Sequence, residues 1–235
     1  MKKIVIGITG SIAAYKIASL ASALKKLHAD VHVLMTENAT NFINPITFET
    51  LTGNKCLVDT FDRNFQYSVE HVSLAKKADI VMLAPASANV IGKIAHGIAD
   101  DMLTTTIMAC KCKKIVAPAM NTNMFDNPIV QDNLKVLEHY DYEVISPAIG
   151  YLACGDTGAG KMPEPELLLE YILREIAREK DIKDCVFWLQ QVLHRSLLTL
   201  SVILQIILQE RWDMRLQRYV CSVERMLHLL QDDFY

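Results

Sequence analysis

The sequence predicts an α/β protein built on a doubly wound parallel sheet. Residues 3–9 form a continuous apolar run rich in β-branched side chains, which is typical of a strand buried on both faces. Residues 12–24 follow with apolar side chains at helical spacing, and residues 31–35 form a second short apolar run. A strand, a helix and a strand within roughly thirty residues make a βαβ unit, whose two strands run parallel.

The chain continues this alternation to about residue 180. Pro45 is expected to separate two short helices, and Asp100 and Asp101 are expected to cap the helix that follows them. Proline and acidic residues open the last helix, as the helix dipole favours. The predicted elements are two short helices within 38–51, a strand at 79–84, a helical stretch after 89, a helix at 102–110, strands at 114–117 and 142–145, and a helix from 163 to about 180.

Composition and charge describe an ordinary globular protein. The chain is 51% hydrophobic and 22% charged, and its net charge of -3 gives no reason to expect nucleic acid or an acidic membrane as a partner. The apolar run at the N-terminus is too short for a signal peptide. Six cysteines at irregular spacing do not indicate a disulfide framework. These features predict a reducing, cytoplasmic location.

Composition changes near residue 184, and we divide the chain into a domain at 1–181 and a tail at 182–235. The tail is rich in Leu, Gln and Arg, and it has no glycine or proline after Asp184. Residues 186–208 are apolar enough to suggest a membrane-spanning helix. The polar and charged side chains of Gln190, His194 and Arg195 argue against it.

Polar residues gather where the predicted strands end, which is where doubly wound sheets bind ligands. Gly10 and Ser11 open a helix and offer backbone and hydroxyl donors to an anion, and Ser87 and Asn89 offer more at a later helix start. The pattern suits a phosphate-bearing cofactor, although a tight βα turn needs glycine in any case. The full Gly-x-Gly-x-x-Gly fingerprint is absent, which argues against a nicotinamide cofactor.

Three further residues have both a chemical and a structural interpretation. His71 is placed just before a helix, as an acid–base group or as an exposed or capping histidine. Asn121 follows a strand and suits either a ligand contact or an Asx turn or N-cap. Cys154 is either a reactive thiol or a small buried side chain.

Cys110 and Cys112 have no second ligand pair nearby, so no metal site is predicted.

Four ordered segments carry a family resemblance: GSIAAYK at 10–16, PASAN through GIADDML at 85–103, PAMNTNM at 118–124, and GYLACG at 150–155. Over about residues 2–181 the chain resembles the flavin-containing cysteine decarboxylases. The resemblance implies a flavodoxin-like (Rossmann-like) fold that binds FMN, and a homotrimer or a multiple of trimers with each active site at a subunit boundary.

The resemblance also implies residue roles. His71 would be the catalytic base, Asn121 would hold the substrate carboxylate, and Cys154 would donate a proton from a mobile lid at 150–162. The implied flavin-binding residues are Gly10, Ser11, Ile12, Thr36, Ser87, Ala88 and Asn89, and the implied substrate-binding residues are Asn121, Met124, Ala153 and Lys161. Phe125 and Lys161 depart from the family's usual tryptophan and arginine, so we expect weakened contacts at most.

The implied activity is FMN-dependent decarboxylation of 4′-phosphopantothenoylcysteine to 4′-phosphopantetheine in coenzyme A biosynthesis. By family analogy, the flavin would oxidise the cysteinyl CH₂–S unit to a thioaldehyde, which is the electron sink that loss of carbon dioxide requires. Two alternatives stay open: a peptidyl-cysteine decarboxylase of the same family, and a non-catalytic flavoprotein that regulates a partner.

The tail carries a separate hypothesis. Bifunctional members of the family continue into a ligase domain. Codons from Phe187 onward, read one base out of frame, permit Gly-Pro-Thr and Ser-Ser-Gly-Lys-Met-Gly, which open that domain. We therefore expect 182–235 to be the frameshifted start of a truncated ligase domain, without ligase activity. The alternative is a genuine pair of C-terminal amphipathic helices used in assembly.

Overall fold

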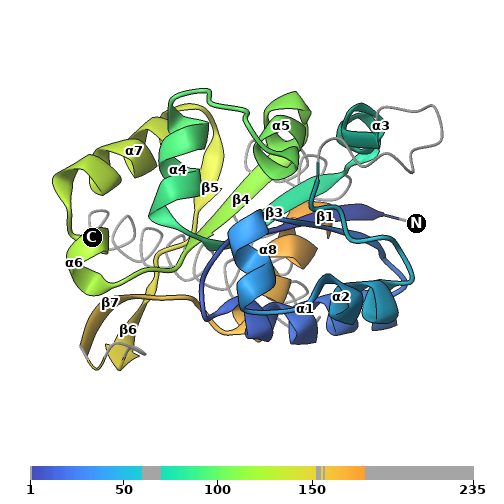
Figure 1. Ribbon diagram of the computed structural model, residues 1–235, viewed down its shortest axis with the longest axis horizontal. Coiled ribbons are helices and arrows are strands. Elements are labelled where there is room, and N and C mark those ends of the chain that lie inside the picture. Colours follow the sequence, from blue (N-terminus) through green and yellow to red (C-terminus); the bar gives the residue numbers. More distant parts are fainter. Residues whose placement is uncertain (1, 60–69, 152–154, 156, 178–235) are drawn as a thin grey trace, which may run out of the picture. The chain divides into compact units, whose positions relative to one another are not determined.

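A five-stranded parallel sheet forms the centre of the protein. The computed structural model describes residues 2–59, 70–151, 155 and 157–177. The strands lie in the order β2-β1-β3-β4-β5 (Figure 1). Their bounds are β1 Lys3–Ile8, β2 Asp30–Met35, β3 Ile80–Ala86, β4 Lys113–Pro118 and β5 Tyr142–Val144. This is the strand order of flavodoxin-like sheets, so the predicted fold class is confirmed.

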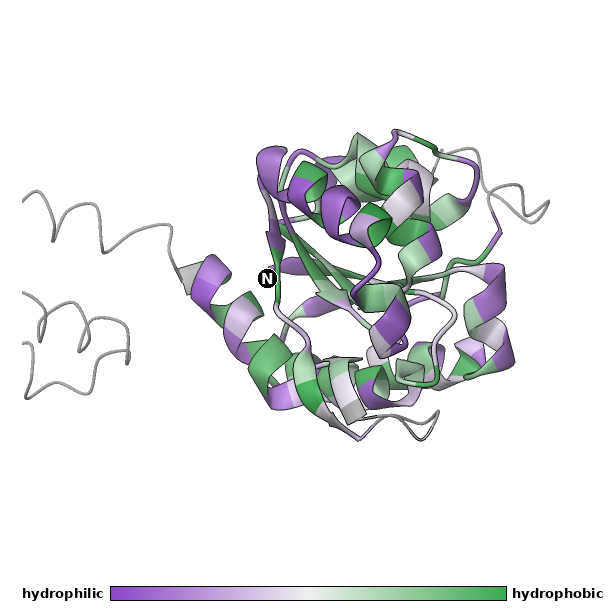
Figure 2. Cartoon of the chain, turned by 90° about the vertical axis from the view of Figure 1, so that its left-hand side faces the viewer, coloured by the Kyte–Doolittle hydropathy of each residue, from purple (hydrophilic) through white to green (hydrophobic). Residues whose placement is uncertain are grey.

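Helices follow the strands and cover both faces of the sheet. They are α1 Ala14–Lys26, α2 Pro45–Thr52, α3 Glu70–Lys77, α4 Ala88–Ala95, α5 Met102–Ala109, α6 Thr122–Phe125, α7 Pro128–His139 and α8 Pro165–Ala177, with a 3₁₀ turn, η1, at Glu37–Asn41. One buried cluster joins the sheet to α1, α2 and α8, and a second joins it to α3, α4, α5 and α7. Figure 2 shows the apolar strands enclosed between the two helical layers.

Most predicted elements are present, with small shifts at their ends. Pro45 occupies the first turn of α2, and the Asn44 side chain caps that helix by accepting from Ile46 N. Asp101 caps α5, as predicted, and the structure adds a reciprocal capping box with Thr104 that the sequence analysis did not predict. His71 was predicted to lie just before a helix. This prediction was wrong, because His71 lies inside the first turn of α3.

The glycine-rich segment 150–162 was expected to be a loop, and this expectation was wrong in part. Ala148–Tyr151 (β6) and Thr157–Lys161 (β7) pair antiparallel as a separate two-stranded sheet. Glycine and alanine have low strand propensity, so no local pattern predicted these two strands. Backbone contacts from the rest of the protein decide this conformation.

The predicted boundary between 181 and 182 lies outside the described residues, and so does the whole tail. The two-domain division and the frameshift hypothesis therefore remain predictions. The same holds for the apolar stretch at 186–208. Within the described part of the chain, no helix is both long and apolar enough to cross a membrane.

A polar cluster joins β1 to β2 at the edge of the sheet where these strands begin. Asp30 Oδ2 lies 2.6 Å from Lys3 Nζ and 3.1 Å from His32 Nε2, and Asn54 Nδ2 donates to Asp30 Oδ1 at 2.9 Å. Burial alone would raise the pKa of Asp30, but the hydrogen bonds from Lys3, Asn54 and His32 outweigh it and hold that pKa well below its usual range.

We expect Asp30→Asn to lower the free energy of unfolding by about 2 kcal/mol at pH 7. The pKa is lower in the folded state, so the stabilisation is complete above the unfolded value of about 3.9 and is lost as the pH falls below it. Denaturant unfolding between pH 7 and pH 3 measures this, and the difference between the two proteins should narrow toward pH 3, because the unfolded carboxylate takes up its proton before the folded one does. Asp132→Asn is the control, since Asp132 pairs only with exposed Lys135. A difference that does not change with pH would contradict the prediction.

Candidate functional site

The buried hydroxyl of Thr9 ties together the ends of β1 and β3. Thr9 Oγ1 donates to Pro85 O at 2.7 Å and accepts from Ser87 N at 2.9 Å, and Thr9 is fully buried. The Ala84–Pro85 peptide bond is cis. These contacts hold the start of α4, which carries the predicted flavin-binding residues Ser87 and Ala88, beside the turn that precedes α1.

The end of β2 meets the same edge. Thr36 N donates to Ile8 O at 3.0 Å, which places Thr36 beside the end of β1. A Cβ on Gly10 would stand 2.9 Å from Cβ of Asn38, so the backbone at Gly10 approaches η1 too closely for any larger residue. Thr36 Oγ1 is buried, and it has no hydrogen-bond partner among the described residues. A buried hydroxyl in this position is suited to a ligand.

The end of β4 carries Asn121 and is joined to the hairpin of β6 and β7. Ala119 N donates to Ala86 O, and Met120 N donates to Gly160 O, both at 3.0 Å. Asn121 caps the short helix α6, where its Oδ1 accepts from Asn123 N at 2.8 Å. Asn121 therefore has the structural role that the sequence left open, and the residue also lines the cavity described next.

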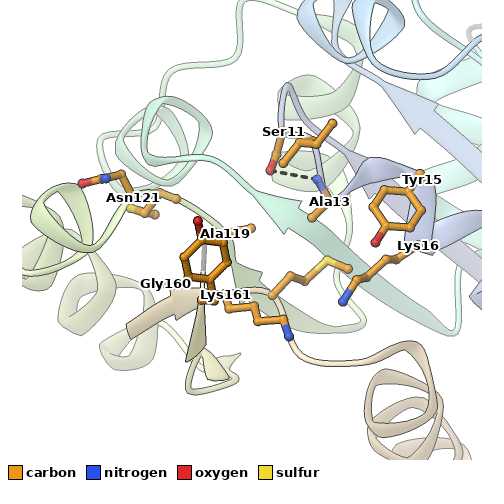
Figure 3. Close-up of a pocket in the computed structure, with 12 residues that line it drawn as sticks. Ser11, Ala13, Tyr15, Lys16, Ala119, Asn121, Gly160 and Lys161 are labelled. Atoms are coloured by element: carbon orange, nitrogen blue, oxygen red, sulfur yellow. Dashed lines mark hydrogen bonds between the residues drawn. The ribbon is translucent and has the colours of Figure 1, made fainter. Parts of the chain in front are cut away.

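A cavity of about 480 Å³ lies between the N-terminus of α1, the end of β4 and the hairpin. Figure 3 shows Ser11 and Ala13 on one side, and Ala119, Asn121 and Gly160 on the other. Its lining combines small or apolar residues with a few polar groups, as in most small-molecule sites. The lining residues are Ser11, Ile12, Ala13, Tyr15, Lys16, Ala119, Met120, Asn121, Tyr151, Gly160, Lys161 and Met162.

Two lysines from distant parts of the chain line this cavity and share one carboxylate. Lys16 Nζ lies 2.8 Å and 2.7 Å from the two carboxylate oxygens of Glu164, and Lys161 Nζ lies 3.5 Å from Oε1. The hydrogen bond from Lys16 holds the pKa of Glu164 below its usual range. Two cations against one carboxylate leave a positive balance in this group, which favours an anionic ligand.

The structure brings together only some of the predicted site residues. Ser11, Ile12, Asn121 and Lys161 line the cavity. Gly10, Thr36, Ser87, Ala88 and Asn89 lie at the ends of β1, β2 and β3 but are not in its lining, and Met124 is 49% exposed on α6. Ala153, Cys154 and the His71 side chain lie outside what the structure describes.

Sequence reasoning missed several residues of the site. Thr9 was read only as part of a strand, and Tyr15, Lys16, Tyr151 and Glu164 had no assigned role. Lys16 and Glu164 are separated by 148 positions, so no local pattern connects them. In the described part of the chain, no group of three or more His, Cys, Asp or Glu side chains is arranged to hold a metal ion.

Comparison with known proteins identifies the family. Residues 1–177 match the family described as Flavoprotein, which is most of the chain. The chain belongs to the flavoprotein family. The resemblance to flavin-containing cysteine decarboxylases that the four motifs indicated is thereby confirmed at the level of the family.

Curated relatives of this flavoprotein act in coenzyme A biosynthesis. It is 43% identical over 178 residues to the coenzyme A biosynthesis bifunctional protein CoaBC of Bacillus subtilis, covering 76% of this chain and 44% of that protein. It is 41% identical over 177 residues to a probable phosphopantothenoylcysteine decarboxylase of Streptococcus mutans, covering 74% of this chain and 99% of that protein. The chain thus spans about half the length of its bifunctional relatives.

Solved structures of cysteine decarboxylases are similar to this flavoprotein. A cysteine-to-serine mutant of PPC decarboxylase, complexed with pantothenoylaminoethenethiol, matches with a TM-score of 0.65 and 31% identity, covering 73% of this chain and 96% of that one. The peptidyl-cysteine decarboxylase EpiD matches with a TM-score of 0.62 and 31% identity, covering 74% and 99%. Both structures match this chain about equally well. The overall fold therefore does not decide between the two activities for this chain.

Proposed function

We propose that this flavoprotein binds FMN and decarboxylates 4′-phosphopantothenoylcysteine to 4′-phosphopantetheine. The observation that carries the proposal is the cavity itself, which is lined by Ser11 near the N-terminus of α1, by Asn121 and by two lysines. The similarity to the Streptococcus mutans protein over almost its whole length supports the same activity. A substrate with a phosphate and a carboxylate suits the positive balance of Lys16 and Lys161 against Glu164.

The residues present fit FMN at the edge where β1, β2 and β3 end. Thr36 Oγ1 offers a buried hydroxyl without a partner among the described residues, and the N-terminus of α1 at Ser11 suits a phosphate. Ser87 and Thr9 adjoin the point between β1 and β3 where flavodoxin-like sheets bind their cofactor. When bound, FMN supplies the electron sink that loss of carbon dioxide requires.

The chain's own residues would bind and orient the substrate. Asn121 offers its amide N–H groups to the substrate carboxylate, and the cap to Asn123 N fixes the orientation of that amide. Lys161 and Lys16 would attract the anionic substrate into the cavity. We further propose His71 as the base and Cys154 as the proton donor, with Ala153 and Met124 against the substrate. These four roles rest on the family resemblance.

A direct assay tests this function. The purified full chain, loaded with FMN, is incubated with 4′-phosphopantothenoylcysteine, and carbon dioxide and 4′-phosphopantetheine are measured. A peptide ending in cysteine, offered in parallel, tests the activity named for EpiD. We expect turnover of the small substrate only. Turnover of the peptide alone would replace our proposal with the second activity, and a flavin-loaded protein that turns over neither would refute both.

Thr36→Val tests whether the buried hydroxyl contacts the flavin. We expect FMN to bind about tenfold more weakly, because one hydrogen bond is lost. Protein stability should stay the same or rise, because an unpaired buried hydroxyl is replaced by an apolar group of the same shape. Flavin fluorescence titration and denaturant unfolding of the flavin-free protein measure the two effects.

Thr52→Val is the matched control for this substitution. Thr52 is also buried, but its Oγ1 donates to Phe48 O at 2.8 Å. This variant should lose about 1 kcal/mol of stability and bind FMN normally. The reverse pattern, with weak FMN binding in Thr52→Val and normal binding in Thr36→Val, would contradict the assignment.

We also propose that the chain forms homotrimers, or multiples of trimers, in the cytoplasm. The family resemblance supports the trimer, and the irregular spacing of the cysteines with the short apolar run at the N-terminus supports the cytoplasmic location. Light scattering after size-exclusion chromatography measures the assembly directly. A monomer that nevertheless turns over substrate would refute the proposed subunit-boundary site.

A further inference from the structure

Two cysteines lie together at the start of β4, at the end of this strand opposite Asn121. Cys110 ends α5, where its backbone turns extended with φ −73° and ψ 135°, and β4 begins at Lys113. Alternate residues of an extended segment face the same side. Cys110 and Cys112 accordingly both pack against the buried cluster beneath α5, whereas Lys111 between them is exposed.

The two thiols are in contact and differ in their surroundings. A hydrogen bond joins their side chains, and both cysteines are free. Cys110 is 4% exposed, whereas Cys112 is only partly buried. The hydrogen bond from Cys110 and the charge of Lys114 lower the pKa of Cys112, although burial and the charge of Asp79 oppose this shift. The same hydrogen bond and burial raise the pKa of Cys110.

A third cysteine shows that this environment is specific. Cys56 is also a free, buried thiol, but burial and the nearby Glu49 raise its pKa to about 12. Its backbone N–H is bonded to Glu49 Oε1, so a carboxylate and not a lysine faces it. The Cys110–Cys112 pair instead has the ammonium of Lys114 nearby, which also lies 5.1 Å above the ring of Tyr142.

We propose that Cys110 and Cys112 form a redox-active dithiol that reacts with small-molecule disulfides such as glutathione disulfide. The Cys112 thiolate attacks one sulfur of the disulfide, forms a mixed disulfide and expels one thiolate, which takes up a proton. The Cys110 thiol then gives up its proton, and its sulfur attacks the Cys112 sulfur and expels the second thiol. The protein loses two electrons and two protons, and the small disulfide gains them.

The intramolecular bond requires a small contraction of the segment between the two cysteines. Two Cα atoms separated by one extended residue stand about 6.6–7.2 Å apart. Disulfides usually span up to about 6.8 Å, so the pair lies at or just beyond the upper limit, and the segment must contract slightly to form the bond. The site lies at the opposite end of β4 from the cavity, and this proposal does not depend on the proposed decarboxylase activity.

The test uses the flavin-loaded full chain in a glutathione redox buffer, followed by alkylation, digestion and mass spectrometry. In the wild-type protein we expect a disulfide between Cys110 and Cys112 that dithiothreitol reverses. It should form at least about a hundredfold faster than any modification of Cys56. Free alkylation of both Cys110 and Cys112 at the highest proportion of glutathione disulfide would overturn the proposal.

Two variants separate the steps. Cys110→Ala removes the resolving thiol, so a glutathione adduct should persist on Cys112. Cys112→Ser removes the attacking thiol, so Cys110 should remain unmodified. An adduct on Cys110 in Cys112→Ser at the wild-type rate would overturn the assignment of roles. If a variant folds poorly, the wild-type experiment still shows whether the two cysteines form a disulfide. Cys56→Ser is the control and should leave the reaction unchanged.

Discussion

Asn121→Asp is expected to lower kcat/KM for 4′-phosphopantothenoylcysteine by about 10²–10³. The new carboxylate would repel the substrate carboxylate and would remove an amide donor, which is worth about 2.7–4 kcal/mol where a site is built around it. Aspartate caps helices as well as asparagine does, so α6 should keep its start and stability should change little. Steady-state kinetics at saturating FMN measure the loss.

Asn127→Asp is the matched control, because Asn127 has the same local geometry six residues later. Its Oδ1 accepts from Ile129 N at 2.9 Å and caps α7, but the residue is exposed and does not line the cavity. We expect wild-type kinetics from this variant. Equal losses in the two variants would mean that the effect comes from the cap or from surface charge, and the assigned role of Asn121 would then be wrong.

The sequence was sufficient to predict this edge of the sheet because one physical rule places it. The carboxyl ends of parallel strands lie at one edge of the sheet, so Ser11 and Asn121 could be expected at the same edge from their positions after β1 and β4, with β3 between those strands. The family motifs then gave these residues chemical roles. The fold class followed from the same alternation of strands and helices, and the N-cap at Asp101 could be predicted from local residue types.

Other parts of the site depend on contacts that local patterns do not encode. The ion pair of Lys16 with Glu164 joins α1 to the segment before α8, across most of the domain sequence. Thr9 reads as an ordinary β-branched strand residue, yet its buried hydroxyl holds the backbone of Ser87. The hairpin of β6 and β7 has low strand propensity, and its position is set by Met120 and Gly160. Each of these features arises from tertiary structure.

Gly160→Ala is expected to lower kcat/KM by at least about a hundredfold through the hairpin. Gly160 has φ +126°, a conformation that side chains rarely adopt, and a Cβ there would stand 2.3 Å from Met120 O. Met120 O belongs to backbone and cannot rotate away, and Met120 N is itself bonded to Gly160 O. The hairpin must therefore move away from Met120 and Asn121, and displacing a positioning residue by about 1 Å costs roughly 10²-fold in rate.

Gly150→Ala separates this effect from a general loss of hairpin structure. Gly150 lies in the same hairpin, opposite Gly158, but a Cβ there would meet only Lys161 Cδ at 3.6 Å, an ordinary contact. We expect this variant to remain within about 0.5 kcal/mol of wild type in stability and to keep its activity. Circular dichroism should show the five-stranded core intact in both variants, because the hairpin is a separate sheet. If Gly160→Ala retained full activity, the contact between the hairpin and Met120 would not be needed to position Asn121.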